Sequence, residues 1–331
     1  MNYFITQEWQ STYGNHAGMS HLCRLISERY QEEVRHICLP NMPFRFSRPL
    51  YHILYFIISL KLLFIVKKKD TVFLMEYLLP TRNQYIVAFL LKKIVKCKIV
   101  GLVHLVPMDI DGFYSKTSRL MKWTSTVDTI VTLGSSLTEY LKRRGVCVKI
   151  HTSFHYVDLD YYKPIRKNRI DCLRVIFMGN MKRDYDSLAT IVENCPEVEF
   201  VYCRGTSKRE MGDLERFINL KIHGYLSESD LKKIMNSCNI SLNLMYDTIG
   251  SNVITTSLSM GLAMFVSDVG SIHDYCSDKN AVFCKSNNEF ISKLNYYKDH
   301  IDEIAMMMNN SSIAADHLSF DLFYQDIINN A

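Results

Sequence analysis

The sequence predicts an α/β protein made of two doubly wound domains that face each other across a cleft. Short apolar strands alternate with amphipathic helices along most of the 331 residues, a pattern typical of parallel sheets covered on both faces. The length fits two domains, each able to bury its own core, and a loop at 151–170 separates two such series. Ligands of such sheets bind beyond the carboxyl ends of the strands, so we expect the cleft there.

The first series covers the first half of the chain. A strand at 1–9 leads into a turn with Gly14 and Gly18 and then a helix at 19–31. Beyond an apolar stretch at 49–66, the alternation continues as in a parallel sheet with connecting helices. The expected elements are strands at 71–77, 98–106 and 129–134 and helices at 82–95 and 135–145.

The second series repeats the alternation after the 151–170 loop. From about 287 to the end of the chain the pattern is helical. The expected strands lie at 173–179, 198–203, 239–245 and 263–268, and the expected helices at 186–195, 227–238 and 252–261. A shorter apolar stretch at 218–224 precedes the second of these helices.

The apolar stretch at 49–66 raises the question of a membrane span. A spanning helix needs about 20 apolar residues, and this stretch contains His52 and Lys61. A lysine near the middle of a bilayer costs about 2.5–3.5 kcal/mol. Because a polar turn and a short apolar strand follow, we favour a peripheral or buried helix of an α/β domain over a span.

The net charge of +5 is unevenly distributed. Residues 1–150 hold 21 Lys and Arg against 10 Asp and Glu, whereas residues 151–331 hold 18 against 24. The total is too small to indicate nucleic-acid binding. A basic first half beside an apolar helix is typical of a domain that docks on an anionic membrane surface. Solvated helix faces are the alternative explanation.

The ten cysteines are scattered without a C-x-x-C pair, which is typical of reduced thiols in a cytosolic protein. The N-terminal residues lack the pattern of a signal peptide. No G-x-S-x-G, H-E-x-x-H, Walker or G-x-G-x-x-G motif occurs, and Glu76 lies too far downstream to hold the ribose of a nicotinamide cofactor. Asp109 and Asp111 have D-x-D spacing, but we interpret them as loop residues. We therefore expect neither a cofactor nor a metal.

One candidate phosphate site follows the strand at 173–179. Gly179 ends this strand, Lys182 and Arg183 come next, and a helix follows. A glycine lets the backbone approach a ligand, and helix amides with nearby cations attract anions. A plain turn with solvated cations is the equal alternative.

Two further segments carry candidate chemistry. Residues 250–275 contain a small-residue turn and a helix whose first turns carry hydroxyls, which suits a phosphate or a ribose, although ordinary N-capping explains it too. His104 lies at the carboxyl end of an expected strand, where a site is expected. A structural histidine is the alternative there.

Five segments in this order resemble the glycosyltransferases of the GT-B fold, specifically the large retaining family usually called family 4. They are DTIVTLGSSLTEYLKRRGV at 128–146, HYVDLDYYKP at 155–164, RVIFMGNMKRDYDSL at 174–188, HGYLSESDLKKIMNSCNISLNLM at 223–245 and SNVITTSLSMGLAMFVSDVGSIHDY at 251–275. The resemblance implies two Rossmann-like domains: an acceptor-binding domain at 1–160 and a nucleotide-sugar-binding domain at 161–310. It also implies a C-terminal helix at 311–331 that packs back on the first domain.

The resemblance also implies roles for single residues. His104 matches the histidine that borders the reacting sugar, and Lys182 matches the basic residue on the donor diphosphate, so these two are the catalytic candidates. The family's usual arginine falls at Asn180, where Arg183 could substitute. The implied donor-binding residues are Gly14, Gly18, Gly179, Asn180, Arg183, Asn252, Val253, Ile254 and Thr256.

The sequence departs from the family at two positions. The family's two glutamates, eight positions apart, fall at Thr248 and Thr256, with Asp247 as the nearby carboxylate. A carboxylate bond to a ribose hydroxyl is worth about 1.5–3 kcal/mol, and a neutral bond nearer 0.5–1.5 kcal/mol. A non-catalytic homologue that acts as a binding or scaffold subunit therefore stays an alternative, as does a nucleotide-sugar epimerase.

The function that the resemblance implies is retaining transfer of a sugar from a nucleotide-sugar to a saccharide. We expect a lipid-linked acceptor and a role in cell-surface polysaccharide biosynthesis, such as lipopolysaccharide, O-antigen or capsule. The expected location is cytoplasmic, with the N-terminal domain held peripherally at the inner face of the plasma membrane. The expected partners include no nucleic acid.

Overall fold

The computed structural model describes most of the chain and divides it into two compact units. Unit 1 comprises Met1–Phe154 and Phe320–Ala331, and unit 2 comprises His155–Ser319. The sequence places these boundaries at 160 and 310. The described residues are 1–9, 14–42, 47–81, 83–165, 172–179, 182–205 and 212–331.

Unit 1 is built on a six-stranded sheet in which every neighbouring pair is parallel. Its strands in spatial order are β2 (Val34–Leu39), β1 (Asn2–Gln7), β3 (Thr71–Leu74), β4 (Lys98–Val103), β5 (Thr129–Thr132) and β6 (Lys149–Thr152). Its α-helices are α1 (Met19–Arg29), α2 (Ser47–Ile65), α3 (Asn83–Ile94), α4 (Pro107–Phe113), α5 (Thr117–Thr124), α6 (Ser135–Arg143) and α12 (Phe320–Asn330).

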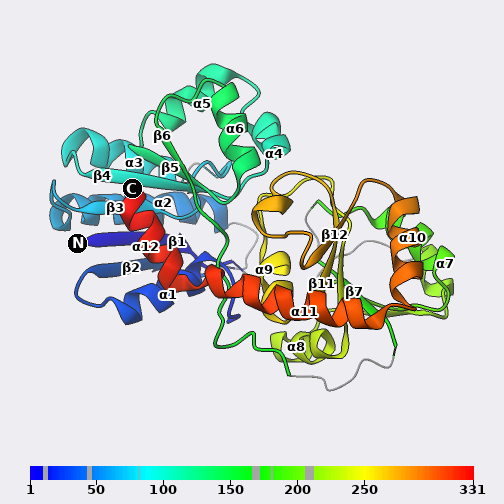
Figure 1. The fold of residues 1–331 in the computed structure, drawn as a ribbon. Helices are drawn as coiled ribbons and strands as arrows, with labels where there is room; N and C mark the ends of the chain where they lie inside the picture. Colours follow the sequence, from blue (N-terminus) through cyan, green and yellow to red (C-terminus); the bar gives the residue numbers. More distant parts are fainter. Residues whose placement is uncertain (10–13, 43–46, 82, 166–171, 180–181, 206–211) are drawn as a thin grey trace. The chain divides into compact units, whose positions relative to one another are not determined.

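The last helix, α12, returns to unit 1 and packs beside α1 (Figure 1). The Tyr324 hydroxyl lies 3.3 Å from Nδ2 of Asn2, and the ring of Tyr324 lies 4.3 Å from that of Tyr30. Tyr30 also donates a 2.9 Å hydrogen bond to Asp321. These contacts join the two ends of the chain within one unit.

Unit 2 has the same plan. Its parallel sheet contains β12 (Ala281–Cys284), β11 (Ala263–Ser267), β10 (Ile240–Asn243), β7 (Arg174–Met178), β8 (Glu199–Cys203) and β9 (Leu220–His223) in spatial order. Its α-helices are α7 (Tyr185–Asn194), α8 (Glu228–Ser237), α9 (Asn252–Ser259), α10 (Asn287–Tyr297) and α11 (Ile301–Ala315).

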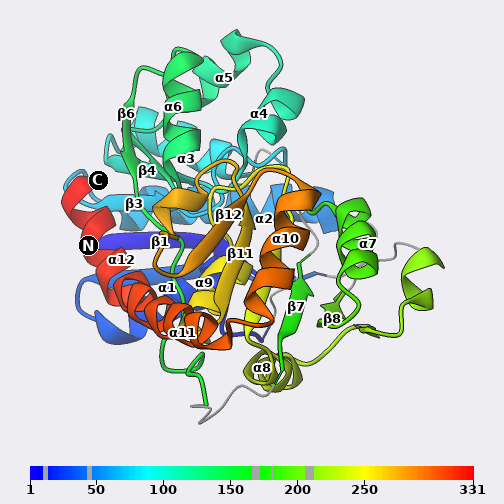
Figure 2. The same cartoon turned by 45° about the vertical axis from the view of Figure 1, so that its right-hand side comes forward.

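Helices cover both faces of the unit 2 sheet (Figure 2). On one face, Leu188 of α7 and Leu294 of α10 join a buried cluster with Phe177 and Phe265. On the other face, Ser257 of α9 lies 2.9 Å from Ser241 of β10. Because both faces are covered, the strands are apolar almost throughout, which is why the sequence shows them clearly.

Four strands are absent from the sequence-based assignment: β2, β6, β12 and β9, the last of which was noted only as a short apolar stretch. Each lies at an edge of its sheet, and β2 and β6 carry exposed or half-exposed residues through most of their length. An edge strand has one neighbour and can keep polar side chains, so it lacks the apolar run of a central strand. The interior strands were predicted correctly.

The apolar stretch at 49–66 forms most of α2. Tyr51, Tyr55 and Leu62 are buried on its inner side. Its outer side also carries large apolar groups, and Phe64 is 90% exposed. Across the described residues, no helix combines the length and hydropathy that a bilayer crossing requires.

Candidate functional site

The carboxyl edge of the unit 1 sheet brings together the ends of β1, β3 and β4. His104 follows β4, and its Nε2 lies 2.8 Å from the carbonyl oxygen of Met75, which follows β3. A carbonyl only accepts, so Nε2 carries the proton and donates this bond. The bond fixes the orientation of a half-buried imidazole at this edge of the sheet.

The predicted glycine turn after β1 lies at the same edge. Gly14 and Gly18 have φ angles of +76° and +86°, a region that residues other than glycine rarely adopt. Gly18 is the N-cap of α1, and its carbonyl accepts from the backbone N–H of Leu22. These φ angles explain why glycine occupies both positions ahead of α1.

Glu76, the residue after Met75, is a buried acid that sequence reasoning did not select as a site residue. Its Oε2 accepts a 2.7 Å bond from Gln84, and its Oε1 accepts a 3.4 Å bond from the N–H of Gln7. Within the described residues no cation pairs with Glu76, and burial raises its pKa to about 8. The sequence did contain a signal for this residue, because Glu76 is the one carboxyl in the apolar run 72–79, close to the end of the expected strand.

In unit 2, the structure brings Gly179, Arg183 and the start of α9 together. Gly179 ends β7 with a φ of +94°, and a Cβ placed on it would lie 3.1 Å from both Arg183 Nε and Val253 Cγ2. The absence of a side chain therefore leaves room for the guanidinium. The sequence predicted each of these three residues as donor-binding.

The guanidinium of Arg183 is buried and lacks a carboxylate partner among the described residues. Arg183 as a whole is only 6% exposed. Nη1 donates a 3.1 Å bond to Asn243 Oδ1, and Nε has no hydrogen-bond partner. Burial lowers the pKa of Arg183 to about 10, which leaves it charged at neutral pH. A buried cation without a counter-ion favours a nearby anion, because an unpaired buried charge is costly.

The turn that carries Arg183 is held to the strand beside it. Lys182 has a left-handed φ of +54°, and its carbonyl accepts a 3.0 Å bond from the N–H of Tyr246. Arg183 forms an isolated antiparallel bridge with Met245. Asn180 lies outside the described residues.

The N-terminus of α9 adds backbone donors next to Arg183. The Ser251 side chain caps the helix by accepting from the N–H of Ile254 at 3.4 Å. The N–H groups of Asn252 and Val253 have no partner in the described part of the chain. Unpaired amides at a helix start favour anions, because they lie at the positive end of the helix dipole.

The two threonines at the family's glutamate positions are engaged locally. Thr256 is nearly buried, and its hydroxyl donates a 2.5 Å bond to the carbonyl of Asn252. Thr248 is also buried, and its Oγ1 accepts from the N–H of Gly250 at 3.1 Å. Each hydroxyl thus stabilises the 248–256 segment.

Asp109 and Asp111, interpreted from the sequence as loop residues, lie in helix α4 instead. Asp111 accepts from the Tyr140 hydroxyl and forms an ion pair with Arg144 at 2.5 Å. Among the described residues, no group of three or more His, Cys, Asp or Glu side chains could hold a metal ion.

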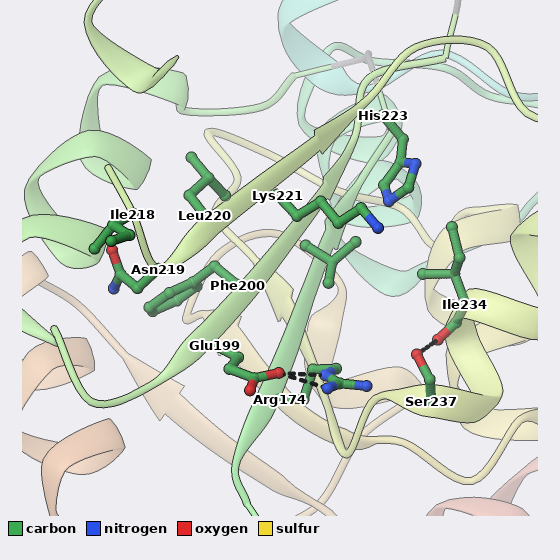
Figure 3. A pocket seen from close by; sticks show the side chains of 11 residues that line it. Arg174, Glu199, Phe200, Ile218, Asn219, Leu220, Lys221, His223, Ile234 and Ser237 are labelled. Atoms are coloured by element: carbon green, nitrogen blue, oxygen red, sulfur yellow. Dashed lines mark hydrogen bonds and ion pairs between the residues drawn. The ribbon is translucent and has the colours of Figure 1, made fainter. Parts of the chain in front are cut away.

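A pocket of about 590 Å³ lies elsewhere in unit 2, along edge strand β9. Figure 3 shows Lys221 and His223 on its sheet wall, Ile234 and Ser237 of α8 opposite, and the 2.7 Å Arg174–Glu199 pair at one end. It contains none of the predicted site residues. The Arg174–Glu199 pair lies at the amino ends of β7 and β8, opposite Gly179.

Known structures share this architecture along nearly the whole chain. Sucrose-phosphate synthase from Thermosynechococcus elongatus matches with a TM-score of 0.77 at 10% identity, covering 99% of this chain and 98% of that one. HepE from Anabaena in complex with UDP matches with a TM-score of 0.76 at 12% identity, covering 99% of each chain. The chain has the GT-B fold.

A third GT-B structure is the lipopolysaccharide outer core galactosyltransferase WaaB in its apo form. It matches with a TM-score of 0.69 at 12% identity, covering 100% of this chain and 99% of that one. No protein-family model and no curated protein sequence matches the chain. The structural likenesses confirm the prediction of two Rossmann-like domains.

Proposed function

We propose that this protein is a retaining glycosyltransferase that moves a sugar from a nucleotide-sugar to a saccharide acceptor. The observation that carries the proposal is the buried guanidinium of Arg183, held between Gly179 and the start of α9. A nucleotide-sugar supplies a diphosphate, the anion that such a cation requires. The GT-B neighbour HepE was determined with UDP and with UDP-glucose, which supports a donor of this class.

In the proposed reaction the bond from the anomeric carbon to the diphosphate breaks while the acceptor hydroxyl attacks the same face of the sugar, and the hydroxyl proton passes to an oxygen of the departing diphosphate. Negative charge develops on the departing diphosphate and positive charge on the sugar ring. Arg183, Lys182 and the Asn252 and Val253 amides would stabilise the diphosphate. We propose that these groups suffice without a metal, and activity retained in the presence of EDTA would support this.

His104 is our candidate for the residue that borders the reacting sugar. It follows the carboxyl end of β4, and its bond to the Met75 carbonyl fixes the ring. Gly14 and Gly18 precede α1 with φ angles that favour glycine, and a Cβ added to Gly14 would meet no heavy atom within 4 Å. These residues would form the unit 1 part of the site.

We propose a lipid-linked acceptor and peripheral docking of unit 1 on the cytoplasmic face of the membrane. The outer side of α2 exposes an apolar stripe at helical spacing, formed by Ile53, Ile57, Leu60 and Phe64. Exposed Lys67–Lys69 follow directly. An apolar stripe beside cations fits an anionic bilayer surface. WaaB, named for lipopolysaccharide outer core synthesis, supports a role in cell-surface polysaccharide assembly.

The decisive experiment incubates the full chain with a panel of nucleotide-sugars and follows nucleotide release with and without lipid-linked saccharides. We expect one donor to release its nucleotide when acceptor is present, and Arg183→Met to abolish the release. Arg216→Met is the matched control, because Arg216 is exposed and pairs with Glu193. Absence of release with every donor contradicts the proposal.

The local engagement of Thr248 and Thr256 favours one alternative, a non-catalytic binding subunit. In that case the same panel gives no turnover, while saccharide binding remains measurable. Conversion of a free nucleotide-sugar without acceptor would instead indicate an epimerase.

A further inference from the structure

A second basic site lies in unit 1, at the amino ends of its strands. A hollow of about 560 Å³ opens where α3 ends and β3 and β4 begin. Four lysines contribute to its lining, together with one acid and one thiol. The lining residues are Lys68, Lys92, Lys96, Cys97, Lys98 and Asp128.

The charges in this hollow are not balanced. Asp128 pairs with Lys92 and also accepts a 2.9 Å bond from the N–H of Ile99. Lys68, Lys96 and Lys98 are exposed, and their ammonium groups have no hydrogen bond or ion pair within the described residues. Three ammonium groups around one hollow repel each other, and a multiply charged anion would relieve that repulsion.

The backbone places one of these lysines at a conformational cost. Lys96 ends the α3 turn with a φ of +58°, and its N–H donates to the carbonyl of Leu91 at 2.9 Å. Helices commonly end this way, but usually with glycine, which adopts this conformation without strain. Here the position carries a cation that lines the hollow.

The hollow adjoins the proposed membrane-docking side of unit 1. Lys68 follows the last turn of α2, which contains the exposed Phe64, and α2 packs along α3. The hollow lies at the amino end of β4, whereas His104 follows its carboxyl end. Six residues of strand separate the two by about 20 Å, so a ligand in the hollow is distinct from the acceptor at the reacting sugar.

We propose that this hollow binds the headgroup of a phospholipid that bears a phosphomonoester, and so anchors unit 1 on the membrane. A phosphomonoester carries about 1.5–2 negative charges at neutral pH and offers three acceptor oxygens. It therefore suits three unpaired ammonium groups better than the single charge of a phosphodiester. The inference rests on the membrane part of the proposed function and is independent of donor chemistry.

The test measures binding of the full chain to vesicles of phosphatidylcholine mixed with phosphatidic acid or phosphatidylglycerol at equal surface charge. We expect at least about fivefold tighter binding to the phosphatidic acid vesicles. Lys96→Gln/Lys98→Gln should abolish this preference. The matched control, Lys116→Gln/Lys122→Gln, removes two exposed lysines of unit 1 that lie outside the hollow and should retain it. Equal binding to both vesicle types, or equal loss in both variants, overturns the proposal.

Two further measurements distinguish a failure of the lipid-binding proposal from a failure of the proposed enzymatic function. Glycerol 3-phosphate at constant ionic strength tests for a free ligand: if it stabilises the chain against heating as strongly as the vesicles do, the lipid assignment is wrong. Nucleotide release with a soluble acceptor should be unchanged in Lys96→Gln/Lys98→Gln. Loss of the vesicle preference with intact release therefore tests the hollow alone, whereas absence of release in the wild type tests the proposed function alone.

Discussion

Nη1 of Arg183 lies 3.1 Å from Oδ1 of Asn243, and this is the one hydrogen bond of the guanidinium among the described residues. Asn243 is the last residue of β10, and Arg183 lies in the segment that follows β7, the neighbouring strand. The contact therefore joins two segments at the carboxyl edge of the unit 2 sheet. Among the described residues, the partners of the guanidinium comprise one neutral acceptor and no carboxylate. The site therefore has an unmet requirement for negative charge, which a donor diphosphate would satisfy.

Lys182 offers a test that separates charge from backbone strain. Its φ of +54° costs a residue with a side chain about 1–2 kcal/mol relative to glycine. Lys182→Gly should therefore be more stable than Lys182→Ala by about 1 kcal/mol in denaturant unfolding. Both variants lose the ammonium group, so both should lower kcat/KM by the same factor. Recovery of turnover in the glycine variant would show that the charge has no role.

His104→Ala tests the proposed unit 1 part of the site. The change removes the ring that Met75 orients, so we expect kcat to fall at least about 100-fold. The unfolding midpoint should stay close to that of the wild type, because His104 is only half-buried. The control is His317→Ala, which removes an exposed histidine. Unchanged turnover would refute the role of His104.

The buried carboxyl of Glu76 predicts a pH dependence of stability. Its pKa is raised from 4.5 to about 8 by burial, so the folded state holds a proton that the unfolded state releases. Its contribution to stability is fully present below pH 4.5 and is lost as pH rises through about 8. The free energy of unfolding should fall by up to about 1.4 kcal/mol per pH unit over that window.

The matched variant for this effect is Glu76→Gln, which keeps an acceptor for Gln84 and cannot ionise. Chemical denaturation between pH 5 and pH 9 should show a flatter profile for Glu76→Gln than for the wild type. The variant should become the more stable protein at the alkaline end. Parallel profiles would mean that Glu76 is ionised throughout the range.

The docking surface predicts a salt-dependent interaction with vesicles. Charge reversal of Lys67–Lys69 should weaken binding to anionic vesicles more than tenfold at low salt, since each nearby cation contributes about 1 kcal/mol. Phe64→Ser should weaken binding at both low and high salt, because it removes apolar contact rather than charge. Tyr225→Ser, an exposed aromatic of unit 2, is the control. If these lysines and Phe64 contact only solvent, neither the charge reversal nor Phe64→Ser changes the amount of protein that cosediments with the vesicles, and the docking surface is refuted.

The sequence predicted the central strands of both sheets, because these strands depend on short local apolar patterns. The edge strands were missed: β2, β6 and β9 carry polar and half-exposed residues, and β12 is apolar but only four residues long. The burial of Arg183 against Asn243 was also beyond prediction, since it joins residues 60 positions apart. For the same reason, the sequence did not reveal that Gln84 and Gln7 surround Glu76.

The central claim is tested most directly by calorimetric titration of nucleoside diphosphates and the matching monophosphates into the wild type and Arg183→Met. We expect at least one diphosphate to bind the wild type, and at least about tenfold weaker binding to the variant, since a bond to a charged group contributes about 1.5–3 kcal/mol. Without ligand, Arg183→Met should be as stable as the wild type or more so, because a buried unpaired cation is removed. Equal diphosphate affinity in both proteins, or no binding to either, would contradict the account.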